Sequence, residues 1–321
     1  MLSGKELIFA TRPYAKEIRS KSWLLTLSTL FLLMADMAAV LFVPYFAIRA
    51  VCSVLLGLLM VRMFIIYHDY EHYAILHKSR LARIIMPLFG AYTLTPQSIW
   101  KRSHDHHHKH NSKLFTSSIG SYLIITKSKF LSMSKREQRE YLASRHPITI
   151  ILGYFFIFMI GMCLGSFINN PRKHYDSLLA LLAHFAISFA IIWFFGWIVW
   201  IFAIFIPFNI ASSLGAYLFY AQHNFPGVIF NDNGSWCYEK AAMESSSFMK
   251  LSPLMHWFTG NIGYHHIHHL NSRIPFYRLP EVMRDIPELQ NVKTTSLSVK
   301  DIIACLRLKV WDQDTGRMVS V

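Results

Sequence analysis

Four long apolar stretches limit what this chain can fold into. They cover residues 23–43, 45–67, 148–168 and 178–220. A helix of about 20 apolar residues crosses a bilayer, and backbone groups in lipid must be paired within helices or closed barrels. Only 16% of the residues are charged, well below an ordinary soluble domain. The first three stretches therefore each predict one transmembrane helix.

The fourth stretch is too long for one crossing at about 1.5 Å rise per residue, and Pro207 interrupts it. Two crossings would put the histidines that follow it on the opposite side from those before the third stretch. We therefore expect one crossing within 178–207 and a helical extension over 208–222. The prediction is an all-α integral membrane protein with four transmembrane helices in two hairpins.

The basic residues mark one side of the membrane. The net charge is +14, and Lys and Arg gather before the first stretch, after the second and behind the last. By the positive-inside rule these segments are cytoplasmic. Arg172 and Lys173 are the exception, because parity puts residues 169–177 outside. The basic residues flank apolar stretches and form no separate domain, which excludes nucleic-acid binding.

These observations divide the single domain, residues 1–321, into three parts. Residues 1–22 are expected to be a basic interfacial segment, and residues 23–222 hold the spans with a cytoplasmic insert at 68–147. Within that insert, residues 81–94 are apolar enough to lie on the membrane surface. Residues 223–321 would form a cytoplasmic helical cap.

Histidines are concentrated in three short clusters. One holds His68 and His72; the others follow an i, i+3, i+4 pattern and comprise His104, His107, His108 and His265, His268, His269. Such spacings put imidazoles on one face of a helix. Eight imidazoles suffice for two metal ions with open positions, and by ligand type they suit iron, copper or zinc. The four cysteines are scattered without a CxxC pair, so we predict no thiolate site and no disulfide framework.

Two aspartates lie next to candidate ligands. Metal-bound histidines usually donate their second N–H to a carboxylate or a carbonyl, so Asp69 and Asp105 are candidates to accept these bonds. The remaining histidines of the clusters and their neighbourhood are expected to be surface or supporting residues, and they are His77, His106, His110 and His266. Isolated histidines are expected to be structural, and they are His146, His174, His184 and His256.

The order HxxxH, HxxHH, HxxHH resembles the membrane fatty acid desaturase family. The run LFYAQHNF at 218–225 resembles the segment after the last span of acyl-lipid desaturases of the Δ12/ω6 type. The run WFTGNIGYHHIHHL at 257–270, followed by IPFY at 274–277, resembles the third histidine box of that group. The likeness covers roughly residues 35–285. It departs in the residues between His68 and His72 and in the additional His266.

This resemblance implies a chemistry and a set of ligands. Two iron ions would be bound by the eight histidines above, and His223 matches a further ligand of the family. O₂ would be the oxidant, and a membrane lipid or other acyl chain would gain a cis double bond. Two electrons must come from an external donor, a ferredoxin or small cytochrome. A narrow apolar tunnel lined by the second and fourth spans and residues 225–257 would hold the acyl chain.

Two alternatives stay open at this point. Hydroxylases, epoxygenases and enzymes that form triple bonds share these ligands within the superfamily. A histidine-rich metal transporter is disfavoured, because a transport pathway needs polar groups at mid-membrane depth, and the span centres offer little beyond Asp36 and His184. We recognise no signal, transit or retention pattern, so we expect a bacterial cytoplasmic membrane with the metal site facing the cytoplasm.

Overall fold

The computed structural model describes residues 2–114, 122–232 and 234–321; residues 115–121 of the predicted insert lie outside this description. Within these ranges, four helices are long and apolar enough to cross a membrane. They are α2 (Arg19–Phe42), α3 (Phe46–Glu71), α10 (Tyr175–Phe195) and the run Trp197–Ala221, composed of α11 (Trp197–Trp200), η3 (Ile201–Phe205) and α12 (Ile206–Ala221). The predicted fold class, helical with four transmembrane helices, is confirmed.

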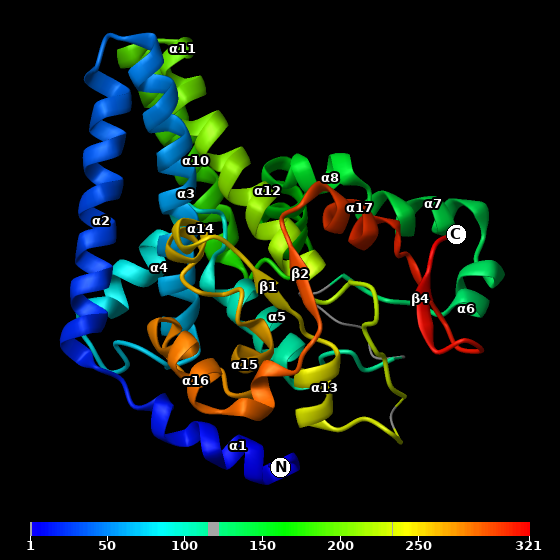
Figure 1. Cartoon of the computed structure of the whole chain (residues 1–321). Coiled ribbons are helices and arrows are strands. Elements are labelled where there is room, and N and C mark those ends of the chain that lie inside the picture. The colour runs from blue at the N-terminus through cyan, green and yellow to red at the C-terminus, as the bar shows by residue number, and fades with distance from the viewer. Residues whose placement is uncertain (1, 115–121, 233) are drawn as a thin grey trace.

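These four helices form two hairpins whose turns lie at the same end of the molecule (Figure 1). Three residues join α2 to α3, whereas α10 and α11 are separated by Gly196 alone, whose φ of 85° suits glycine. The hairpins meet where α3 packs on the last run: Ser53 Oγ donates to the Phe202 carbonyl at 2.7 Å. A Cβ on Gly57 would lie 2.8 Å from Ile210 Cβ, so this close approach requires glycine.

The allocation of the third and fourth spans was wrong. Residues 148–168 do not form a long helix. They fold into α8 (Pro147–Ile151), the π-helical segment η2 (Tyr154–Gly165) and α9 (Ser166–Asn169), of which Tyr154–Asn169 is too short to count among the four spans. The stretch 178–220 instead supplies both remaining spans. Pro207 lies in the first turn of α12, where a missing N–H costs little, so it does not end the helix.

This correction also moves the segment around Arg172 and Lys173 to the other side. Ser98 in α5 (Gln97–His110), the helix of the second histidine cluster, donates from its N–H and its hydroxyl to the Asp176 carboxylate at 2.9 and 2.5 Å. Ser98 Oγ also lies 2.7 Å from His174 Nδ1. The segment therefore lies on the histidine side, and the exception to the positive-inside pattern disappears.

Along the chain, the described residues between the first hairpin and α8 form four further helices. They are α4 (Ala82–Tyr92), α5, α6 (Lys127–Ser132) and α7 (Lys135–Ser144). α4 occupies most of the predicted surface segment 81–94 and exposes Ile84 and Leu88. The end of α3 is tied to α5, since Gln97 Nε2 donates to Glu71 Oε1 at 2.8 Å. This bond brings the first and second histidine clusters together.

The cap after α12 is built mainly of short helices joined by loops. Its helices are α13 (Tyr238–Glu244), α14 (Pro253–Phe258), α15 (His265–Leu270), η4 (Phe276–Arg278), α16 (Leu279–Asp285), η5 (Pro287–Gln290) and α17 (Val299–Arg307). The described part of the cap also holds two small sheets. β1 (Phe248–Lys250) pairs in parallel with β2 (Thr294–Ser296), and β3 (Val310–Asp312) pairs antiparallel with β4 (Arg317–Val319). The cap encloses α15, whose six residues are all buried.

The N-terminal segment precedes the first span and contacts the cap. It forms α1 (Gly4–Thr11) and η1 (Arg12–Ala15), which run beneath the cap at the end opposite the hairpin turns (Figure 1). Leu7 is buried in a cluster with Ile267 and Leu270. Leu7 thus packs against the cap, whereas Phe9 stays exposed, and the interfacial role of residues 1–22 stays a prediction.

The corrected topology makes a labelling prediction. Pro44 in the α2–α3 turn and Asn170 before α10 are both exposed, and the structure puts them on opposite sides of the membrane. With the exposed Cys237 replaced by Ser, a membrane-impermeant maleimide should label only one of the single variants Pro44→Cys and Asn170→Cys in sealed right-side-out vesicles, and the other only after the vesicles are permeabilised. Labelling of both from one face would restore the topology predicted from sequence.

Candidate metal centre

All nine histidines expected as ligands meet in the interior, below the spans. They come from four places: His68 and His72 at the end of α3, three residues of α5, His223 just after α12, and three residues of α15. Their side-chain nitrogens form two groups, and within each group the nitrogens lie within 4.8 Å of one another. The groups are His68, His72, His104, His108, His268 and His107, His223, His265, His269.

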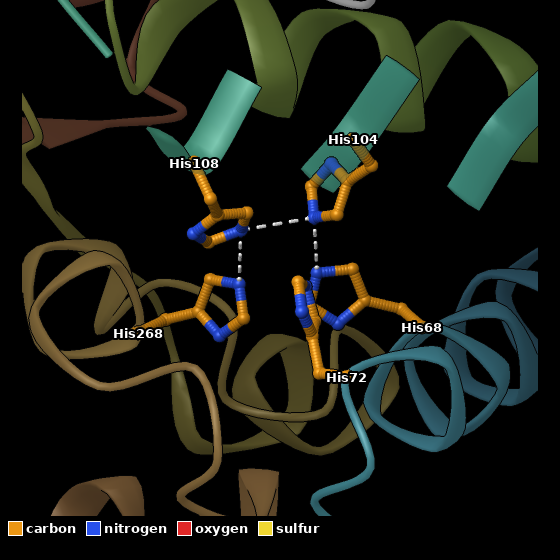
Figure 2. A group of neighbouring side chains, drawn as sticks. All are labelled: His68, His72, His104, His108 and His268. Carbon is orange, nitrogen blue, oxygen red and sulfur yellow. Dashed lines mark hydrogen bonds between the residues drawn. The ribbon is translucent and has the colours of Figure 1, made fainter. Parts of the chain in front are cut away.

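The first group has five imidazoles that face a common centre (Figure 2). Nε2 of His104 lies 2.9 Å from Nε2 of His68 and 3.1 Å from Nε2 of His108, and Nε2 of His268 lies 3.0 Å from that of His108. The buried Nε2 of His72 has no hydrogen-bond partner. Two nitrogens bound to one ion at about 2.1 Å, at right angles, are about 3 Å apart. The spacing therefore fits a shared ion.

The second group closes into a ring of four Nε2 atoms. The successive distances are 3.0 Å from His107 to His223, 2.8 Å to His265, 3.1 Å to His269 and 3.2 Å back to His107. A neutral imidazole Nε2 carries either one hydrogen or one lone pair. Four such atoms form at most two good hydrogen bonds, although four close contacts are present. A cation at the centre would satisfy all four lone pairs, so the residues fit a metal ion.

The two HxxHH clusters divide their histidines between the groups in opposite ways. In α5, His104 and His108 belong to the first group and His107 to the second; in α15, His265 and His269 belong to the second group and His268 to the first. A helix turns about 100° per residue, so positions i and i+4 differ by about 40° while i+3 is turned away from both. Each cluster therefore contributes to both groups, and its three imidazoles do not all point toward one centre.

Burial lowers the pKa of the imidazoles from α5, from α15 and of His223, which favours their neutral form. The pKa of His223 is lowered to about 4 by desolvation. Burial also holds the pKa of the ligands from α5 and α15 well below the usual range, with neighbouring histidines adding to the effect, and these are His104, His107, His108, His265, His268 and His269. Their lone pairs are therefore available to a metal at neutral pH.

Hydrogen bonds to the outer nitrogens orient two of the rings. Asp69 Oδ1 accepts from His68 Nδ1 at 3.0 Å, and its Oδ2 accepts the Phe276 N–H at 2.6 Å. The Ser245 carbonyl accepts from His223 Nδ1 at 2.9 Å. Each bond places the hydrogen on Nδ1 and leaves the Nε2 lone pair facing the group.

Asp105 does not have the position that its sequence neighbourhood suggested. Its carboxylate lies 3.2 Å from Lys101 Nζ, and 40% of its side chain is exposed. It therefore belongs to the outer face of α5, and the expectation that it accepts a hydrogen bond from a ligand is corrected. His106 and His110 share that outer face, and their rings stack 4.2 Å apart. His266 is buried, and its Nε2 donates to the Leu289 carbonyl at 3.1 Å, so it supports the cap.

Two aromatic residues that sequence analysis did not single out wall the site. Trp100 stacks on His104 with ring centroids 4.6 Å apart, and the Phe219 ring lies 4.9 Å from that of His107. Trp100 is four residues before His104, the spacing of neighbours on one helix face, and this was the available signal. Both rings keep water from the ligands.

Arg62 is a further ionisable residue within the spans that was not singled out from the sequence. It is buried within α3, donates to the Trp257 carbonyl and to Thr29 Oγ1, and lies 4.1 Å from the centroid of the Trp257 ring. It thus joins both helices of the first hairpin to α14. A buried cation fixed by such contacts serves packing and not a transport pathway.

Comparisons with known proteins identify the family to which this chain belongs. The model of the fatty acid desaturase family matches residues 44–295. A protein of Bacillus subtilis (strain 168) named fatty acid desaturase is 34% identical over 279 residues, which cover 87% of this chain and 78% of the relative. With the histidine groups inside the matched region, the chain belongs to the fatty acid desaturase family.

Proposed function

We propose that this chain is an O₂-dependent desaturase that introduces a cis double bond into a lipid-linked acyl chain, with two iron ions held by the two histidine groups. The observation that carries the proposal is the convergence of nine imidazole nitrogens, eight from buried histidines and one from the half-buried His223, on two adjacent centres. Bound iron would supply the oxidation of an unactivated C–H bond, which no side chain performs unaided. The first group offers five histidines and the second group four, so an ion in the second group has room for a further ligand.

The chain itself contributes positioning and exclusion of water. Asp69 and the Ser245 carbonyl hold His68 and His223 in the ligating tautomer, and Trp100 and Phe219 keep the surroundings apolar. Removal of one hydrogen from each of two adjacent acyl carbons, with O₂, two electrons and two protons, gives the alkene and two waters. The electrons come from an external donor, and the metal side of the protein faces the cytoplasm of a bacterium.

A small cleft offers the acyl chain an approach to the second group. It holds about 40 Å³ and reaches His107 and His223 between Tyr122, Phe219 and Tyr220. Phe219 and Tyr220 belong to α12, the last part of the fourth span, whereas the residues that line this cleft include none of the second span, so the tunnel expected from the sequence stays a prediction.

The product assay tests the proposal. A bacterial host that expresses the chain with a ferredoxin donor should gain an unsaturated fatty acid, detected by gas chromatography–mass spectrometry with double-bond localisation. The same host with the His268→Ala variant should lack it. A hydroxylated product in its place would move the protein to the hydroxylases of the superfamily, and no new product despite bound iron and donor would contradict the proposal.

The neighbours His265 and His266 provide a matched test of the ligand set. His265→Gln should lose the metal of the second group and with it the product, because a ring of four imidazoles would become a ring of three. His266→Gln keeps a side-chain N–H for the Leu289 carbonyl and should retain both metal and product. Metal analysis and product formation are measured on both variants; equal behaviour of the pair would refute the assignment.

The pair Asp69 and Asp105 tests the support of His68. Asn at position 69 offers one oxygen to two N–H donors, so one donor would face an NH₂ group. Asp69→Asn should weaken metal retention by about 10- to 100-fold, measured as residual metal after dialysis against a graded chelator series. Asp105→Asn, on the exposed face of α5, is the control and should match the wild type. Unchanged metal retention in the Asp69→Asn variant would show that Asp69 does not support the metal site.

A further inference from the structure

The outer face of α5 borders a hollow that the metal centre does not use. It holds about 800 Å³ and lies between α5 and the beginning of α10. Arg102 and Lys109, two helical turns apart, lie on its α5 side, with Asp105 between them, and Asp176 lies on its α10 side. We call this feature the α5 hollow.

The charged side chains that line the α5 hollow sum to a net positive charge, because Lys101, Arg102 and Lys109 face two carboxylates, Asp105 and Asp176. Asp105 is paired with Lys101 at 3.2 Å, and Asp176 accepts both the N–H and the hydroxyl of Ser98. Arg102 and Lys109 are exposed, and neither has an ion pair in the part of the chain that the structure describes. Asp105 is thus paired with Lys101, and the two further cations, Arg102 and Lys109, outnumber the one remaining carboxylate of the lining, Asp176.

The same helix connects the α5 hollow to the metal centre. His104, His107 and His108 lie on the buried face of α5, and Arg102 and Lys109 on its exposed face. An α-helix with its side chains is about 10–12 Å across. A redox group seated against Arg102 and Lys109 would therefore lie about one helix diameter from ligands of both histidine groups.

We propose that the α5 hollow is the docking site of an acidic electron-carrier protein. The proposal rests on the proposed function, which requires two electrons per turnover from outside the chain; each carrier would give up one electron and leave oxidised. Complementary charge steers such encounters and sets their rate. The competing occupant is an anionic lipid headgroup, because the hollow adjoins the beginning of a transmembrane helix.

Rapid-mixing kinetics with the detergent-purified, iron-loaded protein test this docking. A reduced plant-type [2Fe–2S] ferredoxin is the probe, and its reoxidation is followed by absorbance without O₂. The double variant Arg102→Glu/Lys109→Glu should lower the second-order rate at least 10-fold at low ionic strength, and salt should narrow the difference. Reduction by dithionite, which needs no docking, should be unchanged.

The matched control is Lys135→Glu/Arg139→Glu on α7, which changes the net charge equally at two exposed sites. Its ferredoxin rate should stay within about twofold of the wild type; an equal loss there would mean a general charge effect and overturn the proposal. An unchanged rate in the α5 double variant, or a parallel loss with dithionite, would overturn it too.

Binding to phosphatidylglycerol vesicles separates the two occupants. Loss of vesicle binding with an unchanged ferredoxin rate in the α5 double variant would assign the hollow to a lipid headgroup and refute docking. The proposed function fails separately: it fails if the wild-type protein, reduced by either route and given O₂, forms no unsaturated product from an acyl lipid.

Discussion

Nine imidazoles converge on two points where their nitrogens make more close contacts than hydrogen bonds can fill, and this constraint organises the rest of the structure. In the ring of His107, His223, His265 and His269, four close contacts compete for at most two hydrogen bonds. Unpaired buried polar atoms are costly. A cation in each group removes this cost, so metal binding and folding of the cap are expected to be coupled.

The elements around the groups are arranged to bring short segments to fixed positions. α15 has only six residues, too few for a stable isolated helix. It is held by the cap and by α1, through contacts of Ile267 and Leu270 with Leu7. The spans fix the other ligands: α3 ends at the first group, and α12 ends two residues before His223. The membrane hairpins thus act as rigid supports for a site that lies outside them.

The sequence predicted which histidines would converge but not their environment. Spacing identified eight histidines, and the family resemblance added His223. The pairs His68-Asp69 and His104-Asp105 look alike in sequence, yet only Asp69 meets a second N–H donor, from Phe276, which is distant in the chain. The stretch 148–168 has the apolarity of a span, but it folds into short and π-helical segments packed against α10 and α12. Apolar sequence is common to segments that contact lipid and segments buried in protein. The positions of the third and fourth spans could therefore be assigned only from the tertiary structure.

Metal analysis combined with X-ray absorption spectroscopy of the purified wild-type protein tests the central claim most directly. The account predicts two iron ions per chain, both bound mainly by imidazole nitrogen, with no sulfur ligand. One ion per chain, or a sulfur-containing shell, would contradict the arrangement of nine histidines in two groups.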